Sequence, residues 1–122
     1  MTFKKGISSI NIMIEHTISE IKTRIQKAGS IKDENKSKLL GLLSSLKSEI
    51  EELSKTKAEH AKSIAGFTDI STHEATREDR NSELLKLSIE GLSSSVKGFE
   101  TSHPKLAEIV NSISLTLSNL GI

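Results

Sequence analysis

The feature that most constrains the fold of this chain is the spacing of its large apolar residues, which recur at steps of three and four in four separate segments. Steps of three and four place side chains on one face of an α-helix. The stripes are Ile7, Ile10, Ile14, Ile18, Ile21 and Ile25; Leu39, Leu43, Leu46, Ile50 and Leu53; Leu85, Ile89, Leu92, Val96 and Phe99; and Leu106, Val110, Ile113, Leu117 and Leu120. Because their period is close to seven residues, the helices should pack at shallow angles, as in bundles and coiled coils. We therefore expect an all-α fold.

Local start and stop signals set the expected bounds of the helices. Glycines suit the position after a helix, small polar or acidic residues suit its start, and proline suits its first turn. These signals are Gly29, Asp33, Gly66, Ser71 with Glu74 as a capping box, Ser102 as a cap, Pro104 and Gly121. They predict four helices, at residues 7–28, 33–65, 72–100 and 104–120.

The expected helix lengths predict an antiparallel four-helix bundle in a single domain, residues 1–122, with a projecting arm. Short connections make neighbouring helices antiparallel, and the second and third helices are longer than the others. Their hairpin, residues 54–82, should project beyond the bundle with Ile64, Phe67 and Ile70 at its tip. An isolated arm buries little apolar surface, so we expect it to pair with a second copy or bind another protein. Alternatively, residues 66–80 form a long loop. The same stripes also fit a closed monomeric bundle or a domain-swapped dimer.

Composition excludes several functional classes. The chain has no Cys, which removes disulfides and thiolate metal sites, and no Trp or Tyr, which argues against base-stacking platforms. Its 17 Lys and Arg against 16 Asp and Glu argue against a nucleic-acid binder. No window is apolar enough to cross a membrane. Asn11 and Glu15 interrupt the apolar stretch after the basic start, so we expect a helix of the mature protein rather than a signal peptide, and a cytoplasmic location.

Histidines beside glutamates supply weak candidates for a metal site. His60 and His73 lie almost symmetrically about the expected turn near Gly66, so an antiparallel hairpin could bring them together. The more ordinary interpretation is two solvated histidines. Glu100 and His103 have the Glu-x-x-His spacing of di-iron bundles, but those sites need a second such motif and further glutamates. We predict no catalytic residue and no cofactor.

A family resemblance rests on the C-terminal part of the chain. The segment Phe99-Glu-Thr-Ser-His-Pro-Lys-Leu106 and the final Leu-Gly-Ile, residues 120–122, resemble a small family of uncharacterised bacterial proteins with a Phe-Glu-x-Ser-His-Pro-x-Leu corner. The resemblance is looser over residues 30–53, and residues 54–82 are longer than is usual in the family. It implies no substrate. It marks Phe99, Ser102, His103 and Pro104 as a signature, which we interpret as a structural corner.

Two functional hypotheses from different classes follow. The first is a non-enzymatic helical interaction or structural protein that self-associates through amphipathic helices. The alternative is a small ligand- or metal-binding helical bundle that uses surface His and Glu side chains. A third possibility is weak binding to an anionic membrane surface through the basic first helix, residues 7–28.

Overall fold

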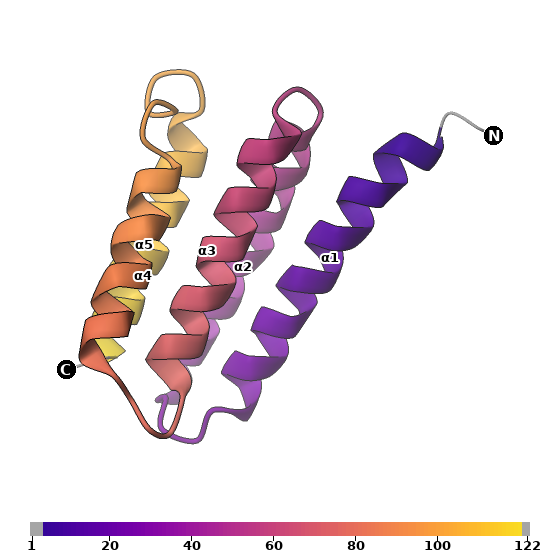
Figure 1. Ribbon diagram of the computed structural model, residues 1–122. Coiled ribbons are helices and arrows are strands. Elements are labelled where there is room, and N and C mark those ends of the chain that lie inside the picture. Colours follow the sequence, from indigo (N-terminus) through magenta and orange to yellow (C-terminus); the bar gives the residue numbers. More distant parts are fainter. Residues whose placement is uncertain (1–3, 121–122) are drawn as a thin grey trace.

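The fold is a bundle of five α-helices, described for residues 4–120 by a computed structural model (Figure 1). The expected all-α class is confirmed. The helices are α1 (Lys4–Lys27), α2 (Asp33–Ser54), α3 (Ala58–Thr76), α4 (Ser82–Ser95) and α5 (Pro104–Leu120). Figure 1 shows successive helices running in opposite directions. No helix within residues 4–120 has the length and apolarity needed to cross a membrane.

The third helix occupies the centre of this bundle. α3 and α4 lie side by side in one layer, α2 and α5 form the layer behind them, and α1 packs along the α2–α3 side (Figure 1). α3 contacts all four other helices, whereas α1, as far as residues 4–120 are concerned, contacts only α2 and α3. Each helix therefore buries its apolar residues against two or more neighbouring helices.

The apolar stripes expected from the sequence form the core. The large side chains that are less than 2% exposed include Ile14, Ile18, Ile21, Ile25, Leu39, Leu43, Leu46, Ile50, Leu53, Ile64, Leu92 and Leu106. Val110, Ile113 and Leu117 of α5 join them. Ile10, Ile89 and Leu120 pack at the margin of the core. The side chain of Ile7 and the stop expected at Gly121 lie outside the described residues.

The predicted helix over residues 33–65 is wrong, because α2 ends at Ser54 and α3 starts at Ala58. The break falls at Lys55–Lys57, where the sequence holds neither Gly nor Pro. The backbone of this turn pairs one of the last carbonyls of α2, because the amide of Lys57 donates to the carbonyl of Leu53 at 2.8 Å. Lys57, with φ −135° and ψ 67°, then redirects the chain into α3.

The predicted helix over residues 72–100 is also wrong. Ser71 and Glu74 do not form a capping box, because both lie inside α3, which continues to Thr76. The next helix begins at Ser82, where the Asn81 side chain accepts a hydrogen bond from the amide of Leu84 at 3.0 Å. Asn81 is therefore the cap that the capping-box interpretation missed. α4 ends at Ser95.

Residues 54–82 do not project as an arm, because the inner face of α3 is built from small and hydroxyl-bearing side chains that bury well. Its fully or nearly buried positions are Ala61, Ile64, Ala65, Thr68, Ser71, Thr72, Glu74 and Ala75. The hydroxyls of Thr68 and Thr72 each donate at 2.8 Å to a carbonyl one turn earlier, so their burial leaves no unpaired donor. Small residues let neighbouring helices approach closely. The alternative of a long loop at 66–80 is also wrong, because the chain is helical as far as Thr76.

Candidate functional site

The three residues predicted to form an interaction tip separate into two groups. Ile64 is fully buried in the core, so its predicted role in binding a partner is wrong. Phe67 is 37% exposed and Ile70 is 50% exposed, and both lie on the outer face of α3. They therefore remain candidates, as part of a helix surface rather than the tip of an arm.

Phe67 and Ile70 belong to a continuous apolar surface formed by α3 and α4. Leu84 and Leu87 on α4 are 41% and 54% exposed. The Ser71 hydroxyl donates to the Ser88 carbonyl at 2.9 Å, which places Ile70 and Leu87 at the same level of the two antiparallel helices. We call Phe67, Ile70, Leu84 and Leu87 the α3–α4 apolar face.

Gly91 lets the Phe67 ring lie against the backbone of α4 in this face. A Cβ atom added at Gly91 would lie 2.7 Å from Cδ1 of Phe67 and 3.1 Å from Cζ, and closer still to Cε1. Separations this short are almost never seen for a real Cβ atom, so only glycine fits under the ring in its present position. Sequence reasoning missed this contact because Gly91 is helical and gives no sign of a stop.

Exposed charged residues of both signs lie on α4, the helix that contributes Leu84 and Leu87 to the α3–α4 apolar face. Glu83, Lys86 and Glu90 are exposed on the same helix as Leu84 and Leu87. None of the three forms an ion pair with another residue of the described part of the chain. Both signs of charge are therefore available on the exposed surface of α4.

The structure does not bring the predicted metal candidates His60 and His73 together. They lie at opposite ends of α3, about 20 Å apart along its axis at 1.5 Å per residue. His60 stacks edge-on against Phe99, with ring centroids 5.4 Å apart, and His103 stacks on Phe99 in the same manner at 5.6 Å. Within residues 4–120, no group of three or more His, Asp or Glu side chains is placed to hold a metal ion.

The residues of the expected structural corner lie in the connection between α4 and α5. Phe99 is buried and Pro104 is the first residue of α5. His103, rather than Ser102, therefore occupies the capping position, and its carbonyl accepts from the amide of Ala107 at 3.2 Å. The Ser102 hydroxyl instead lies 3.0 Å from Nδ1 of His103. Gly98 turns the chain after α4 with φ +95°, a conformation that favours glycine.

Glu100 stabilises this corner through its carboxylate. Its side chain accepts a hydrogen bond from the backbone amide of Gly98 at 2.8 Å. Hydrogen bonds from its own backbone amide and from that of Gly98 lower the pKa of Glu100, and the nearby Lys97 charge adds to the effect. The di-iron interpretation of Glu100 and His103 has no support here, because the carboxylate is directed at the backbone.

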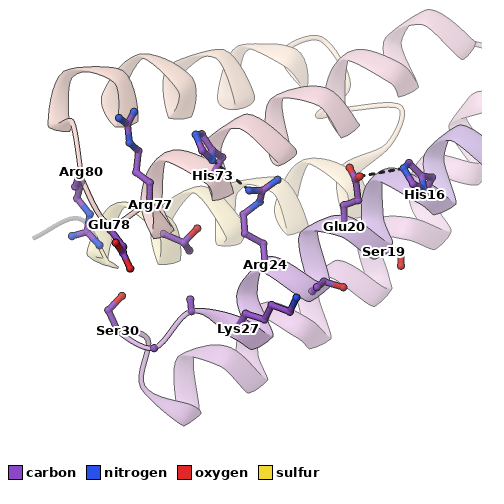
Figure 2. Close-up of a pocket in the computed structure, with 14 residues that line it drawn as sticks. His16, Ser19, Glu20, Arg24, Lys27, Ser30, His73, Arg77, Glu78 and Arg80 are labelled. Atoms are coloured by element: carbon purple, nitrogen blue, oxygen red, sulfur yellow. Dashed lines mark hydrogen bonds and ion pairs between the residues drawn. The ribbon is translucent and has the colours of Figure 1, made fainter.

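A second candidate site is a groove between α1 and the C-terminal end of α3 (Figure 2), which we call the α1–α3 groove. It has a volume of about 1070 Å³ and is open to solvent. α1, the turn after it, α3 and the α3–α4 connection all contribute to its walls. The charged and imidazole side chains that line it are His16, Glu20, Arg24, Lys27, His73, Arg77, Glu78 and Arg80.

Several of these side chains already have partners. Figure 2 shows Arg24 extending from α1 towards His73. Arg24 forms an ion pair with Asp69 at 3.4 Å, and Arg77 forms one with Glu74 at 3.0 Å. Arg80 donates instead to backbone carbonyls, those of Ala75 and Leu120. These last two bonds tie the C-terminal ends of α3 and α5 together.

The sequence pattern does not predict this groove. Arg24 and Lys27 fall in the basic first helix expected at residues 7–28. Arg77 and Arg80 fall inside the helix expected at residues 72–100, although they follow the end of α3. The sequence of Asn81 followed by Ser82 and Glu83 resembles a helix start and was the signal that could have located them.

Comparison with known proteins identifies the chain only at the level of a family. No match was found among curated proteins or among solved structures. One family model matches residues 39–122, which hold most of α2 and all of α3, α4 and α5 but none of α1. The resemblance to an uncharacterised family is thereby confirmed. On that match, the chain belongs to the family described as a domain of unknown function, DUF4404.

Proposed function

We propose that the protein is a non-enzymatic helical interaction protein that self-associates through its α3–α4 apolar face. The observation that carries this proposal is the exposure of four large apolar side chains, at 37–54%, on two adjacent helices. A contiguous exposed apolar surface with a polar border is typical of a protein–protein interface.

A second copy of the same chain is the partner that the surrounding charges favour. A two-fold interface brings the same surface of both copies together, so it must be complementary to itself. Glu83, Lys86 and Glu90 offer both signs of charge at its edge, and each copy can therefore present a cation to an anion of the other. A net charge of +1 adds little general repulsion between two copies.

The size of the face predicts a weak, reversible dimer. α3 has 19 residues and α4 has 14. Two adjacent helices of these lengths present roughly 25 Å by 20 Å, or about 500 Å² per partner. That area is at the low end for specific interfaces, so we expect a dissociation constant in the range of about 10–100 μM.

Sedimentation equilibrium between about 5 and 500 μM tests the proposal across that range. We expect the mass to rise from 13.3 kDa towards twice that value. Leu87→Glu places a charge in the face and should keep the chain monomeric throughout. Leu115→Glu is the matched control, because Leu115 is 62% exposed on α5, away from this face. A chain that stays monomeric at every concentration, or an equal loss of association in both variants, would contradict the proposal.

We further propose that the protein acts in the cytoplasm and without catalysis. The support is the lack of cysteine, which leaves the chain without the disulfides that are common in secreted proteins and without a thiol nucleophile. Cell fractionation with an antibody to the chain tests the location, and its recovery mainly in a membrane or extracellular fraction would contradict it.

A further inference from the structure

The α1–α3 groove collects cationic side chains from separate parts of the chain. Arg24 and Lys27 come from the last turns of α1, and Arg77 and Arg80 come from the connection between α3 and α4. We propose that this groove binds a small organic phosphate, with Arg24 and Lys27 as the principal ligands of its phosphate groups. This site is on a different surface from the α3–α4 apolar face, and the proposal does not depend on self-association.

Arg24 is positioned for an anion but is only weakly paired within the protein. Its side chain is 35% exposed, and its Nη2 lies 3.4 Å from Oδ1 of Asp69. Its Nη1 lies 3.4 Å from Nδ1 of His73, and its Nε is buried with no hydrogen-bond partner among the described residues. Charge-assisted hydrogen bonds are usually about 2.7–2.9 Å long. A phosphate oxygen could therefore form a shorter and stronger bond with this guanidinium than either present partner does.

Lys27 and Arg80 add positive charge that no ion pair of the described residues neutralises, whereas Arg77 is paired with Glu74. Lys27 is exposed and forms no ion pair with any residue in the described part of the chain. Arg80 keeps its full charge, because both of its partners are backbone carbonyls. The carboxylates that line the groove are those of Glu78 and of Glu20, whose Oε2 lies 3.2 Å from Nε2 of His16.

The remaining lining fits a phosphate better than a single carboxylate. The hydroxyls of Ser19, Thr23 and Ser30 also line the groove, whereas that of Thr76 already donates to the carbonyl of Thr72 at 2.8 Å. A phosphate group has three or more acceptor oxygens and can use guanidinium, ammonium and hydroxyl donors together. At about 1070 Å³ the groove is at the upper end of the usual size for small-molecule sites, so it can hold a nucleotide as well as a free diphosphate.

Isothermal titration calorimetry with pyrophosphate and, separately, with ATP in metal-free buffer tests the proposal. We expect saturable binding of at least one of these probes. Lys27→Gln should weaken binding about tenfold, as expected when a charge-assisted hydrogen bond is lost. Lys38→Gln is the matched control, because Lys38 is exposed on α2, outside the groove, and carries the same charge.

Backbone NMR shifts on titration locate the site, and we expect the largest changes at residues 24–30 and 73–80. ATP binding that exceeds pyrophosphate binding would identify a nucleotide-like ligand, whereas equal affinities would identify the phosphate groups alone as the recognised chemistry. Arg24→Gln should abolish binding, with circular dichroism confirming that the variant is folded; Lys27→Gln keeps the test valid if it is not. Absence of binding at about 10 mM probe, or equal weakening by Lys27→Gln and Lys38→Gln, would overturn the proposal.

Discussion

The contact between Gly91 and Phe67 permits a test of the helix packing. The effect of Gly91→Ala on the free energy of unfolding should depend on whether the Phe67 ring is present. In a helix interior, Gly→Ala normally stabilises by about 1 kcal/mol, because alanine has the higher helix propensity. In this chain the new methyl group would collide with the Phe67 ring, whose Cδ1 lies 2.7 Å from the position that the alanine Cβ would occupy. The collision involves only the far end of a side chain, so the ring can swing outwards rather than the helices separating.

The displaced ring sets the magnitude of the effect. Phe67 is 37% exposed, so about two thirds of its surface is covered at present. Complete burial of a phenylalanine is worth about 1.5–3 kcal/mol, and uncovering this ring should therefore cost about 1–2 kcal/mol. Gly91→Ala in the native background should then be neutral or destabilising by up to about 1 kcal/mol, because the gain in helix propensity offsets part of the loss.

A double-mutant cycle with Phe67→Ala isolates this contact. Without the ring, Gly91→Ala should stabilise the chain by about 1 kcal/mol, which corresponds to a coupling of about 1–2 kcal/mol between the two sites. The assay is urea unfolding followed by circular dichroism at a concentration low enough to keep the chain monomeric. If Gly91→Ala has the same effect in both backgrounds, the ring does not rest on α4 and the reasoning is refuted.

Three further perturbations follow from other parts of the fold. Ile64→Ala should destabilise by about 2–5 kcal/mol because Ile64 is fully buried, whereas Ile70→Ala, at a half-exposed site, should cost less than about 1 kcal/mol; similar urea midpoints would contradict this assignment. Asn81→Ala removes the cap of α4 and should cost about 1 kcal/mol in thermal unfolding, with the exposed Ser94→Ala as the control. Because the folded state lowers the pKa of Glu100, its ionised form stabilises the corner above about pH 4.5 and this stabilisation is lost as the pH falls through the lowered pKa. The stability of Glu100→Gln should accordingly be below that of the native chain at pH 7 and equal to it at about pH 2, and a pH-independent difference would contradict the role of the carboxylate.

The parts of the fold that sequence reasoning predicted are those in which large apolar residues do the packing. Ile14, Ile18, Ile21 and Ile25 in α1, and Leu39 to Leu53 in α2, are buried as their spacing indicated. The same holds for the α5 stripe from Leu106 to Leu117. In these helices the apolar residues are also the buried residues, so the period of the apolar pattern is sufficient to predict which positions are buried.

The central helix was missed because its buried face does not look apolar in the sequence. Thr68, Ser71 and Thr72 are buried, yet they are counted as polar in any hydrophobic pattern. Their hydroxyls donate to carbonyls of the same or the adjacent helix, and only the three-dimensional structure reveals that these groups are satisfied. The break at Lys55–Lys57 could not be predicted from the sequence either, because this segment contains no Gly or Pro to end the helix.

The candidate sites were predictable only in part for a related reason. Phe67 and Ile70, expected at the tip of an arm, are exposed on the surface of α3. Leu84 and Leu87 lie on α4, and their position beside α3 could not be predicted without the correct bounds of α3. A hairpin turn near Gly66 could have brought His60 and His73 together, but the chain is helical there and the two histidines lie at opposite ends of α3. Which distant residues lie side by side depends on the order of the helices, and the expected bounds merged parts of α2, α3 and α4 into two long helices.

The position of α1 has a consequence for the synthesis of the chain. Ile14, Ile18, Ile21 and Ile25 of α1 are buried, and within residues 4–120 the helices that contact α1 are α2 and α3, so α1 leaves the ribosome before either of the helices that cover it. From the end of α1 at Lys27 to the end of α3 at Thr76, the ribosome must add about 50 residues, which takes roughly 3–10 s at ordinary rates of translation. During that interval the nascent chain carries an uncovered amphipathic helix. A chaperone that binds exposed apolar helices would therefore find a site at Ile14, Ile18, Ile21 and Ile25 during synthesis, although all four are at most 1% exposed in the finished bundle.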